Sequence, residues 1–163
     1  MPRRQTQLFA DGYYHIYNRG NNHEHIFFEH ENYLFFLRQL RKYFTCDAVE
    51  IIAYCLMPNH YHLLIRLKTD ALPDIMHGFT LSYSKAIGKR FSRVGTLFQG
   101  PFKAILVEKE EYLLELSRYI HLNPLKAGLV VRAEDWEFSS YRDYIGIRAG
   151  TLIVPNVIRA YLP

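Results

Sequence analysis

The sequence predicts an α+β fold of the ferredoxin-like (RRM-like) kind, a four-stranded antiparallel sheet with helices packed on one face. Three observations support this: segments with the alternating pattern of strands, segments with apolar residues at helical spacing, and their β-α-β-β-α-β-α order. The chain has 163 residues, the size of one domain, and no linker or repeat divides it. We therefore expect a single domain over residues 1–163.

The first half of the chain alternates between strand and helix. Residues 12–18 (GYYHIYN) alternate aromatic and polar side chains, which is typical of a half-buried strand. Apolar side chains then recur at helical spacing, and this predicts a helix over residues 30–44. Residues 50–56 and 60–68 are strand-like and flank a Met-Pro-Asn turn, so we expect them to form a hairpin.

The second half continues the same order. Residues 73–91 begin with a proline, which suits the first turn of a helix, and carry apolar side chains along one side. Residues 102–107 are expected to form the fourth strand and residues 110–122 the third long helix. We expect this helix to end at the Asn-Pro pair of positions 123–124, because the residue before proline disfavours helical backbone angles. Within residues 126–163 we expect a short final helix or strand.

The charge of the chain is unevenly distributed. Its net charge of +4 is a modest excess that favours a polyanionic partner. Residues 75–107 contain no Asp or Glu, so the fold should present one positive face. The basic residues of this stretch include Lys85, Lys89, Arg90, Arg93 and Lys103.

The sequence carries no sign of export or of a membrane. Cys46 and Cys55 are too far apart for a CxxC metal or redox pair. No apolar run reaches the length of a membrane span, and no apolar signal region follows the first residues. We therefore expect a cytoplasmic protein that does not contact a membrane.

The first candidate for chemistry is the run His60-Tyr61-His62. Side chains alternate between the faces of a strand, so the two histidines point the same way and Tyr61 points to the opposite layer. Two imidazoles at this spacing can share one cation. Two surface histidines on a half-exposed strand would give the same pattern, and for so short a motif this second interpretation is the more frequent one.

The second candidate lies on the predicted third helix. Tyr119 and Asn123 are one turn apart on the same side of it, so a phenol and an amide can face the same ion. A tyrosine at the edge of the core followed by a helix-ending asparagine would also explain the pair.

Taken together, the two segments resemble a known family. Residues 57–65 (MPNHYHLLI) and 118–128 (RYIHLNPLKAG) resemble the motifs of single-tyrosine HUH transposases. The nearer match is the REP-associated tyrosine transposase branch, in which Asn-Pro follows the tyrosine. Three further matching pieces occur in the family's order, residues 17–22, 95–103 and 136–141. The resemblance covers residues 13–144, nearly the whole predicted domain.

The resemblance implies an activity and a set of site residues. His60 and His62 would be metal ligands, Asn123 a third, amide ligand, and Tyr119 the nucleophile. The metal would be Mg²⁺ or Mn²⁺, and imidazole ligands favour Mn²⁺ somewhat. The reaction would cut and rejoin single-stranded DNA at hairpin-forming sites through a 5′-phosphotyrosine link. The sequence departs from the family at Tyr61, where a smaller aliphatic residue is usual.

We expect basic and amide side chains to bind the DNA, because cations pair with phosphates. The set comprises Arg3, Arg4, Arg19, Asn21, Lys85, Lys89, Arg90, Arg93 and Lys103. For each of these lysines and arginines taken alone, an ordinary solvated surface position is the commoner explanation. The resemblance leaves a homodimer open, since some HUH transposases are dimers while the REP-associated branch includes monomers.

Two other functions remain open. The same architecture serves RNA-recognition domains, so the chain could bind hairpin DNA or RNA without cutting it. No Lys/Arg-Gly-Phe-Gly-Phe run is present, and this function would leave both candidate motifs unused. A metallohydrolase that activates water would not need Tyr119. The covalent protein–DNA adduct distinguishes a tyrosine nucleophile from both.

Overall fold

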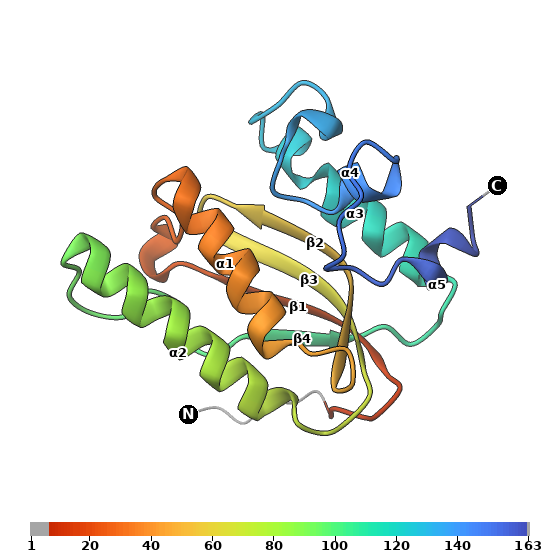
Figure 1. Ribbon diagram of the computed structural model, residues 1–163, viewed down its shortest axis with the longest axis horizontal. Helices are drawn as coiled ribbons and strands as arrows, with labels where there is room; N and C mark the ends of the chain where they lie inside the picture. The colour runs from red at the N-terminus through yellow and green to blue at the C-terminus, as the bar shows by residue number, and fades with distance from the viewer. Residues whose placement is uncertain (1–6, 163) are drawn as a thin grey trace.

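A four-stranded antiparallel sheet organises the molecule, in a computed structural model that describes residues 7–162. The spatial order is β2-β3-β1-β4 (Figure 1). The strands are β1 (Tyr13–Arg19), β2 (Val49–Met57), β3 (His60–Leu67) and β4 (Lys103–Leu106). Each boundary lies within one residue of the expected one, and the predicted α+β, ferredoxin-like class is confirmed.

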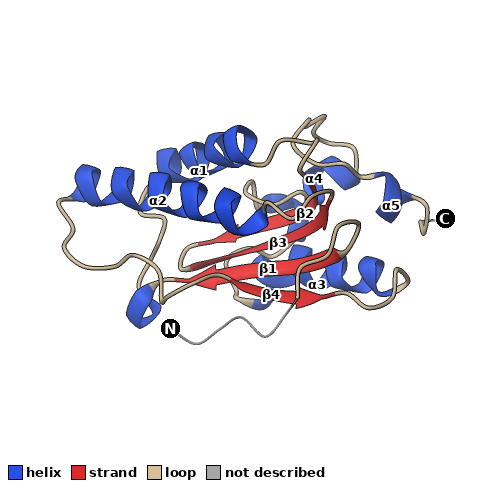
Figure 2. Ribbon diagram, turned by 90° about the horizontal axis from the view of Figure 1, so that it is seen from below, coloured by secondary structure: helices blue, strands red, loops and turns tan. Residues whose placement is uncertain are grey.

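Three long helices cover the sheet, two on one face and one on the other. They are α1 (His30–Tyr43), α2 (Leu72–Phe91) and α3 (Tyr112–Lys126). Figure 2 shows α1 and α2 above the sheet and α3 below it. The expectation that all helices share one face is therefore wrong for α3. The cause is that β2 and β3 carry apolar side chains on both faces, so both faces need a cover.

The layer between the sheet and α1/α2 is built from aromatic side chains. The Phe36 ring of α1 is fully buried, 4.9 Å from the Phe79 ring and 5.0 Å from the Tyr83 ring of α2, centroid to centroid. Tyr61 of β3 enters the same layer, 5.2 Å from Phe36. Such tilted and edge-on pairs add to the free energy gained from burial. Tyr61 thus anchors β3 from the side opposite to its histidines.

The layer under α3 is smaller and aliphatic. Leu113 and Ile120 of α3 are fully buried against Ile52, Cys55 and Leu64 of the sheet. This contact fixes one side of α3 on the sheet and leaves its other side toward solvent.

The helix α3 does not end where the Asn-Pro pair predicts. It continues to Lys126 with Pro124 inside it, and Gly128 follows with a positive φ of 73°. Proline has no N–H, so the Ile120 carbonyl loses its helical donor. The Asn123 side chain compensates, since its Nδ2 donates to the Tyr119 carbonyl at 2.9 Å and lies 3.4 Å from the Ile120 carbonyl.

The C-terminal segment closes the far edge of the sheet. It contains η2 (Ala133–Asp135), α4 (Tyr141–Tyr144) and α5 (Asn156–Arg159), while a further short turn, η1 (Asn21–His23), follows β1. Trp136 Nε1 donates to the Leu56 carbonyl at 3.0 Å, and the Phe138 ring stacks 4.0 Å from the Tyr33 ring of α1. None of the helices within residues 7–162 is long and apolar enough to cross a membrane.

We predict that Phe36→Ala lowers the free energy of unfolding by about 3–5 kcal/mol, because it leaves a cavity at the centre of the aromatic layer. Urea denaturation followed by circular dichroism measures the change. The matched control is Phe9→Ala, since Phe9 is 48% exposed, and it should cost about 1 kcal/mol or less. Equal losses in the two variants would contradict this account of the core.

Candidate active site

Two histidines of β3 face the side of the sheet that α3 covers. His60 is the first residue of β3 and half-buried, while His62 is buried. Their ring centroids are 5.0 Å apart with the rings perpendicular. Burial lowers the pKa of both imidazoles, that of His62 to about 3, so both are neutral near pH 7. Neutral imidazoles at this separation are able to share a cation.

Tyr119 of α3 lies on the same face as these histidines. Its ring centroid is 5.8 Å from that of His62, in an edge-on arrangement, and its side chain is 46% exposed. Lys126, two helical turns further on, places its Nζ 5.4 Å from the centroid of the Tyr119 ring. The phenol therefore combines access from solvent with a neighbouring positive charge.

Asn123 lies next to His60. A hydrogen bond with the Asn123 side chain raises the pKa of His60, which opposes the larger lowering caused by burial. The Nδ2 group of Asn123 is held by carbonyls of its own helix, which leaves Oδ1 as the free atom of the amide. On the other side, His60 Nδ1 is 2.7 Å from Asn59 Oδ1. The amide of Asn123 and the imidazole of His60 thus belong to one cluster.

This cluster suits a hard or borderline divalent cation. Two imidazoles and one amide oxygen are donors that Mg²⁺ and Mn²⁺ accept, and three donors leave positions for other ligands. Within the described residues no three His, Cys, Asp or Glu side chains form a metal-binding group, so a cation here depends on the amide as the third donor. Cys55 pairs with His62 across the sheet, but its side chain is buried and burial strongly raises its pKa, so it stays a thiol.

A polar cavity of about 610 Å³ opens beside His60 at the rim of the sheet. Two of the predicted DNA-binding residues, Arg19 and Lys103, line it and are exposed. Arg19 Nε donates to Gln99 Oε1, which fixes one side of the guanidinium. The remaining lining residues are Tyr17, Asn18, His23 and Asn59.

Tyr119 also borders a groove of about 690 Å³ between β4 and α3. Its walls carry both signs of charge, with Arg118 and Lys126 set against Glu108 and Glu115. Tyr119 is therefore accessible from the side of this groove.

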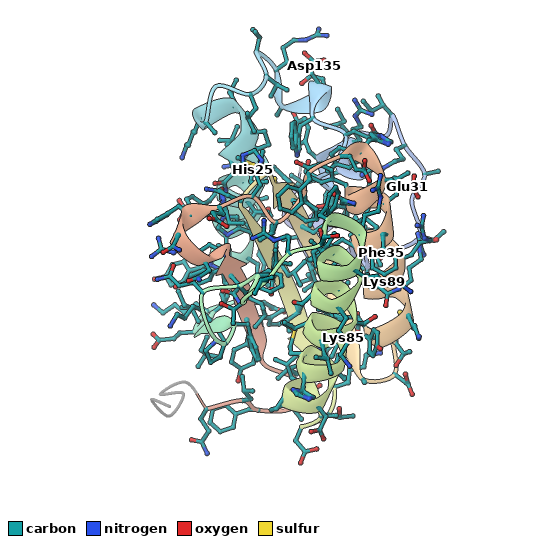
Figure 3. All side chains as sticks on the ribbon, turned by 90° about the vertical axis from the view of Figure 1, so that its left-hand side faces the viewer. His25, Glu31, Phe35, Lys85, Lys89 and Asp135 are labelled. Atoms are coloured by element: carbon teal, nitrogen blue, oxygen red, sulfur yellow. The ribbon has the colours of Figure 1, made fainter. Side chains whose placement is uncertain are left out.

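The other predicted DNA-binding residues lie away from this cavity. Lys85 and Lys89 are exposed along the outer side of α2 (Figure 3), which covers the opposite face of the sheet. Arg90 pairs with Glu29 at 3.3 Å and Arg93 with Glu24 at 3.0 Å, and these ion pairs reduce the charge that both offer.

The expected single positive face is therefore divided. Asn21 lies in η1 and lines a separate cavity beside the end of α2. Arg3 and Arg4 lie outside the described residues.

Sequence reasoning missed two neighbours of the site. Lys126 follows Tyr119 by seven residues, which is two turns of the same helix. The sequence predicted that this helix ends at residue 122, so Lys126 was not expected to lie on it. His15 of β1 is buried with its Nε2 2.8 Å from His62 Nδ1, and its ring is 6.3 Å from that of Tyr119. The position of His15 beside His62 depends on the register between β1 and β3, and this register could not be predicted from the sequence.

His121 plays a structural part. Its Nε2 is 2.7 Å from Ser140 Oγ, and Asp143 lies close enough to act on its charge. A serine, a histidine and an aspartate in this order suggest a hydrolytic triad. However, Ser140 is fully buried and its Oγ also accepts the backbone N–H of Tyr54 at 2.9 Å, so no substrate reaches it.

Comparisons with known proteins point to one family. A sequence model of the family described as "Transposase IS200 like" matches residues 9–123. A protein of Haemophilus influenzae described as a REP-associated tyrosine transposase is 26% identical over 113 residues, which are 60% of this chain and 62% of that protein. The chain thus spans less than two thirds of the length of this relative.

A solved structure resembles the whole fold. It is a REP-associated tyrosine transposase bound to a REP hairpin, with a TM-score of 0.75, 18% identity and 94% of each chain covered. At this level of identity the likeness establishes a shared fold.

We predict that His121→Gln makes the protein less sensitive to acid. Burial lowers the pKa of His121 to about 4, so the unfolded chain binds this proton first as the pH falls from 6.5. The free energy of unfolding is therefore highest above pH 6.5, as far as His121 is concerned. It falls between pH 6.5 and pH 4, by about 1.4 kcal/mol per pH unit at most. Glutamine has no such proton to bind.

Urea denaturation at pH 7.5, 6.0 and 5.0 measures this slope. His77→Gln is the matched control, because His77 is exposed on α2 and should leave the slope unchanged. A slope in His121→Gln as steep as in the wild type would show that His121 is not buried in its neutral form.

Proposed function

Because the chain belongs to the IS200-like transposase family, we propose that it cuts and rejoins single-stranded DNA at hairpin-forming sites, using Tyr119 as the nucleophile. The resemblance of the sequence to the REP-associated branch of this family is confirmed by the matched relative and fold. The observation that carries the proposed chemistry is the approach of Tyr119 to His62 on one face of the sheet, at 5.8 Å between ring centroids.

In the proposed reaction, the phenolic oxygen of Tyr119 attacks the phosphorus of one phosphodiester. A bond forms between this oxygen and phosphorus, and the bond from phosphorus to the 3′ oxygen breaks. The phenol loses its proton and the leaving 3′ oxygen gains one, so the products are a 5′-phosphotyrosine and a 3′-hydroxyl. A 3′-hydroxyl that attacks the phosphotyrosine reverses the exchange, so the number of ester bonds is conserved and no external energy source is needed.

We assign the charge stabilisation that this exchange needs to the cluster beside Tyr119. His60, His62 and Asn123 would hold Mg²⁺ or Mn²⁺, which supplies positive charge to the nonbridging phosphate oxygens when bound. Lys126 adds a positive charge next to the Tyr119 ring, where negative charge develops on the phenolic oxygen. The exposure of Tyr119 gives the phosphodiester access to it.

DNA binding in this proposal uses two separate groups of cations. Arg19 and Lys103 would hold the single strand in the cavity beside His60, close to the reacting phosphate. Lys85 and Lys89 would contact phosphates of a hairpin stem on the outer side of α2, with Arg90 and Arg93 beside them and Asn21 near the junction. The structural relative, solved with a REP hairpin, supports hairpin DNA as the substrate class.

We predict that Tyr119→Phe abolishes the covalent protein–DNA adduct. The assay is incubation with hairpin-flanked single-stranded oligonucleotides and Mn²⁺, resolved on a denaturing gel. The matched control is Tyr112→Phe on the same helix, because its side chain is 48% exposed against 46% for Tyr119. This variant should form the adduct at the wild-type level.

Other outcomes of this assay separate the competing functions. An adduct in Tyr119→Phe would remove Tyr119 from the mechanism. Cleavage without an adduct in the wild type would indicate attack by water, and hairpin binding without cleavage would indicate a binding module. Chelation of divalent cations should abolish the adduct while Tyr119 stays intact.

We further predict different defects for two double variants that each remove two positive charges. Arg19→Ala/Lys103→Ala should weaken hairpin binding and slow single-turnover cleavage at saturating DNA, because both residues lie beside His60. Lys85→Ala/Lys89→Ala should weaken binding with a shallower salt dependence but keep the rate at saturation. Fluorescence anisotropy at several salt concentrations and single-turnover kinetics measure both effects. Identical defects in the two variants would contradict the assignment of different roles to these two groups of cations.

A further inference from the structure

We propose that His15 is a positioning residue for His62: it accepts a hydrogen bond from His62 Nδ1 and so leaves Nε2 of His62 free to bind a cation. This inference rests on the proposed function, in which His62 is a metal ligand. His15 lies on β1 and takes no part in the reaction itself.

The two imidazoles are held in contact by the sheet. In the β1–β3 register, Tyr17 lies opposite His62 and His15 opposite Leu64, so His15 is a diagonal neighbour of His62 on the same face. The distance from His15 Nε2 to His62 Nδ1 is 2.8 Å, and the ring centroids are 5.1 Å apart with 25° between the ring planes, so the two rings meet edge to edge as an in-plane hydrogen bond requires. Both side chains are buried, with 8% and 6% of their surface exposed, so water does not replace this hydrogen bond.

The direction of this hydrogen bond decides whether His62 is able to bind a cation. A neutral imidazole carries one proton, on Nδ1 or on Nε2. If His62 Nδ1 donates to His15, the lone pair of His62 Nε2 is available as a ligand. If His15 donates instead, His62 carries its proton on Nε2 and is blocked.

His60 shows the same arrangement with an unambiguous partner. Its Nδ1 is 2.7 Å from Asn59 Oδ1, and an amide oxygen only accepts, so the proton of His60 is on Nδ1. With its proton on Nδ1, His60 has its lone pair on Nε2. If His15 is the acceptor, His60 and His62 both donate a hydrogen bond from Nδ1, to Asn59 and His15 respectively. Both then have the lone pair of Nε2 available to a cation. Partners of this kind fix the tautomer and the ring orientation of metal-binding histidines, and their loss typically weakens metal affinity 10- to 100-fold.

The first test reads the tautomer without metal or DNA. Nitrogen-15 NMR of the imidazoles, recorded at pH 7.5 on the metal-free protein, distinguishes protonation at Nδ1 from protonation at Nε2. We expect His62 to be protonated at Nδ1 in the wild type and to shift toward Nε2 in His15→Leu. A His62 protonated at Nε2 in the wild type, or unchanged in His15→Leu, would overturn the proposal.

The second test measures the affinity for Mn²⁺ alone, by electron paramagnetic resonance of the free ion. His15→Leu should bind about 10- to 100-fold more weakly than the wild type. His15→Gln should stay within about threefold, because its Oε1 lies near the position of Nε2 and accepts the same hydrogen bond. Equal affinity in His15→Leu and the wild type, or an equal loss in both variants, would overturn the proposal.

The two readouts also separate this inference from the proposed function. If wild-type protein forms no adduct with DNA, the proposed function fails, while the His62 tautomer still tests the role of His15. If the adduct forms and the tautomer does not respond to His15→Leu, only the role of His15 fails. Thermal unfolding of the two variants shows that each is folded before either test.

Discussion

The register of β3 against its neighbours is the constraint on which the candidate site depends. Alternation sends His60 and His62 to one face and Tyr61 to the other, where it packs against Phe36. A slip of one residue would exchange these faces, placing the imidazoles in the aromatic core. Pairing with β1 adds His15 to the same face. Burial on both sides of the sheet makes such a slip costly, so packing in the aromatic layer sets the positions of the proposed ligands.

The helix α3 meets this face with residues of two kinds. Leu113 and Ile120 pack on the sheet, while Tyr119 and Asn123 lie along the border between that contact and solvent. The proline after Asn123 would usually break a helix, yet the asparagine amide takes over the hydrogen bonding of the exposed carbonyls. This side chain therefore adds a hydrogen-bond donor to the last turns of the helix.

Much of the fold was predictable, because strands and helices leave periodic patterns of apolar residues in a single segment. The pairing of His60 with His62 and of Tyr119 with Asn123 is of this local kind. The second face of the sheet, the continuation of α3 through Pro124 and the contact between His15 and His62 depend on segments distant in the sequence, and no local pattern encodes them. The positive stretch was correctly located along the chain, but Arg90 and Arg93 pair with glutamates from another segment and Lys103 lies across the sheet from Lys85.

The division of the cations between the two faces of the sheet has a mechanical consequence. A nucleic acid that touches Lys89 on α2 and Lys103 in the cavity has to change direction at the rim of the sheet. Duplex DNA resists this, since its persistence length is about 150 base pairs, whereas the unpaired joint at the foot of a hairpin swivels freely. A continuous duplex would then be too stiff to contact the cations of α2 and those of the cavity at the same time. Such a selection would need no contact with the bases.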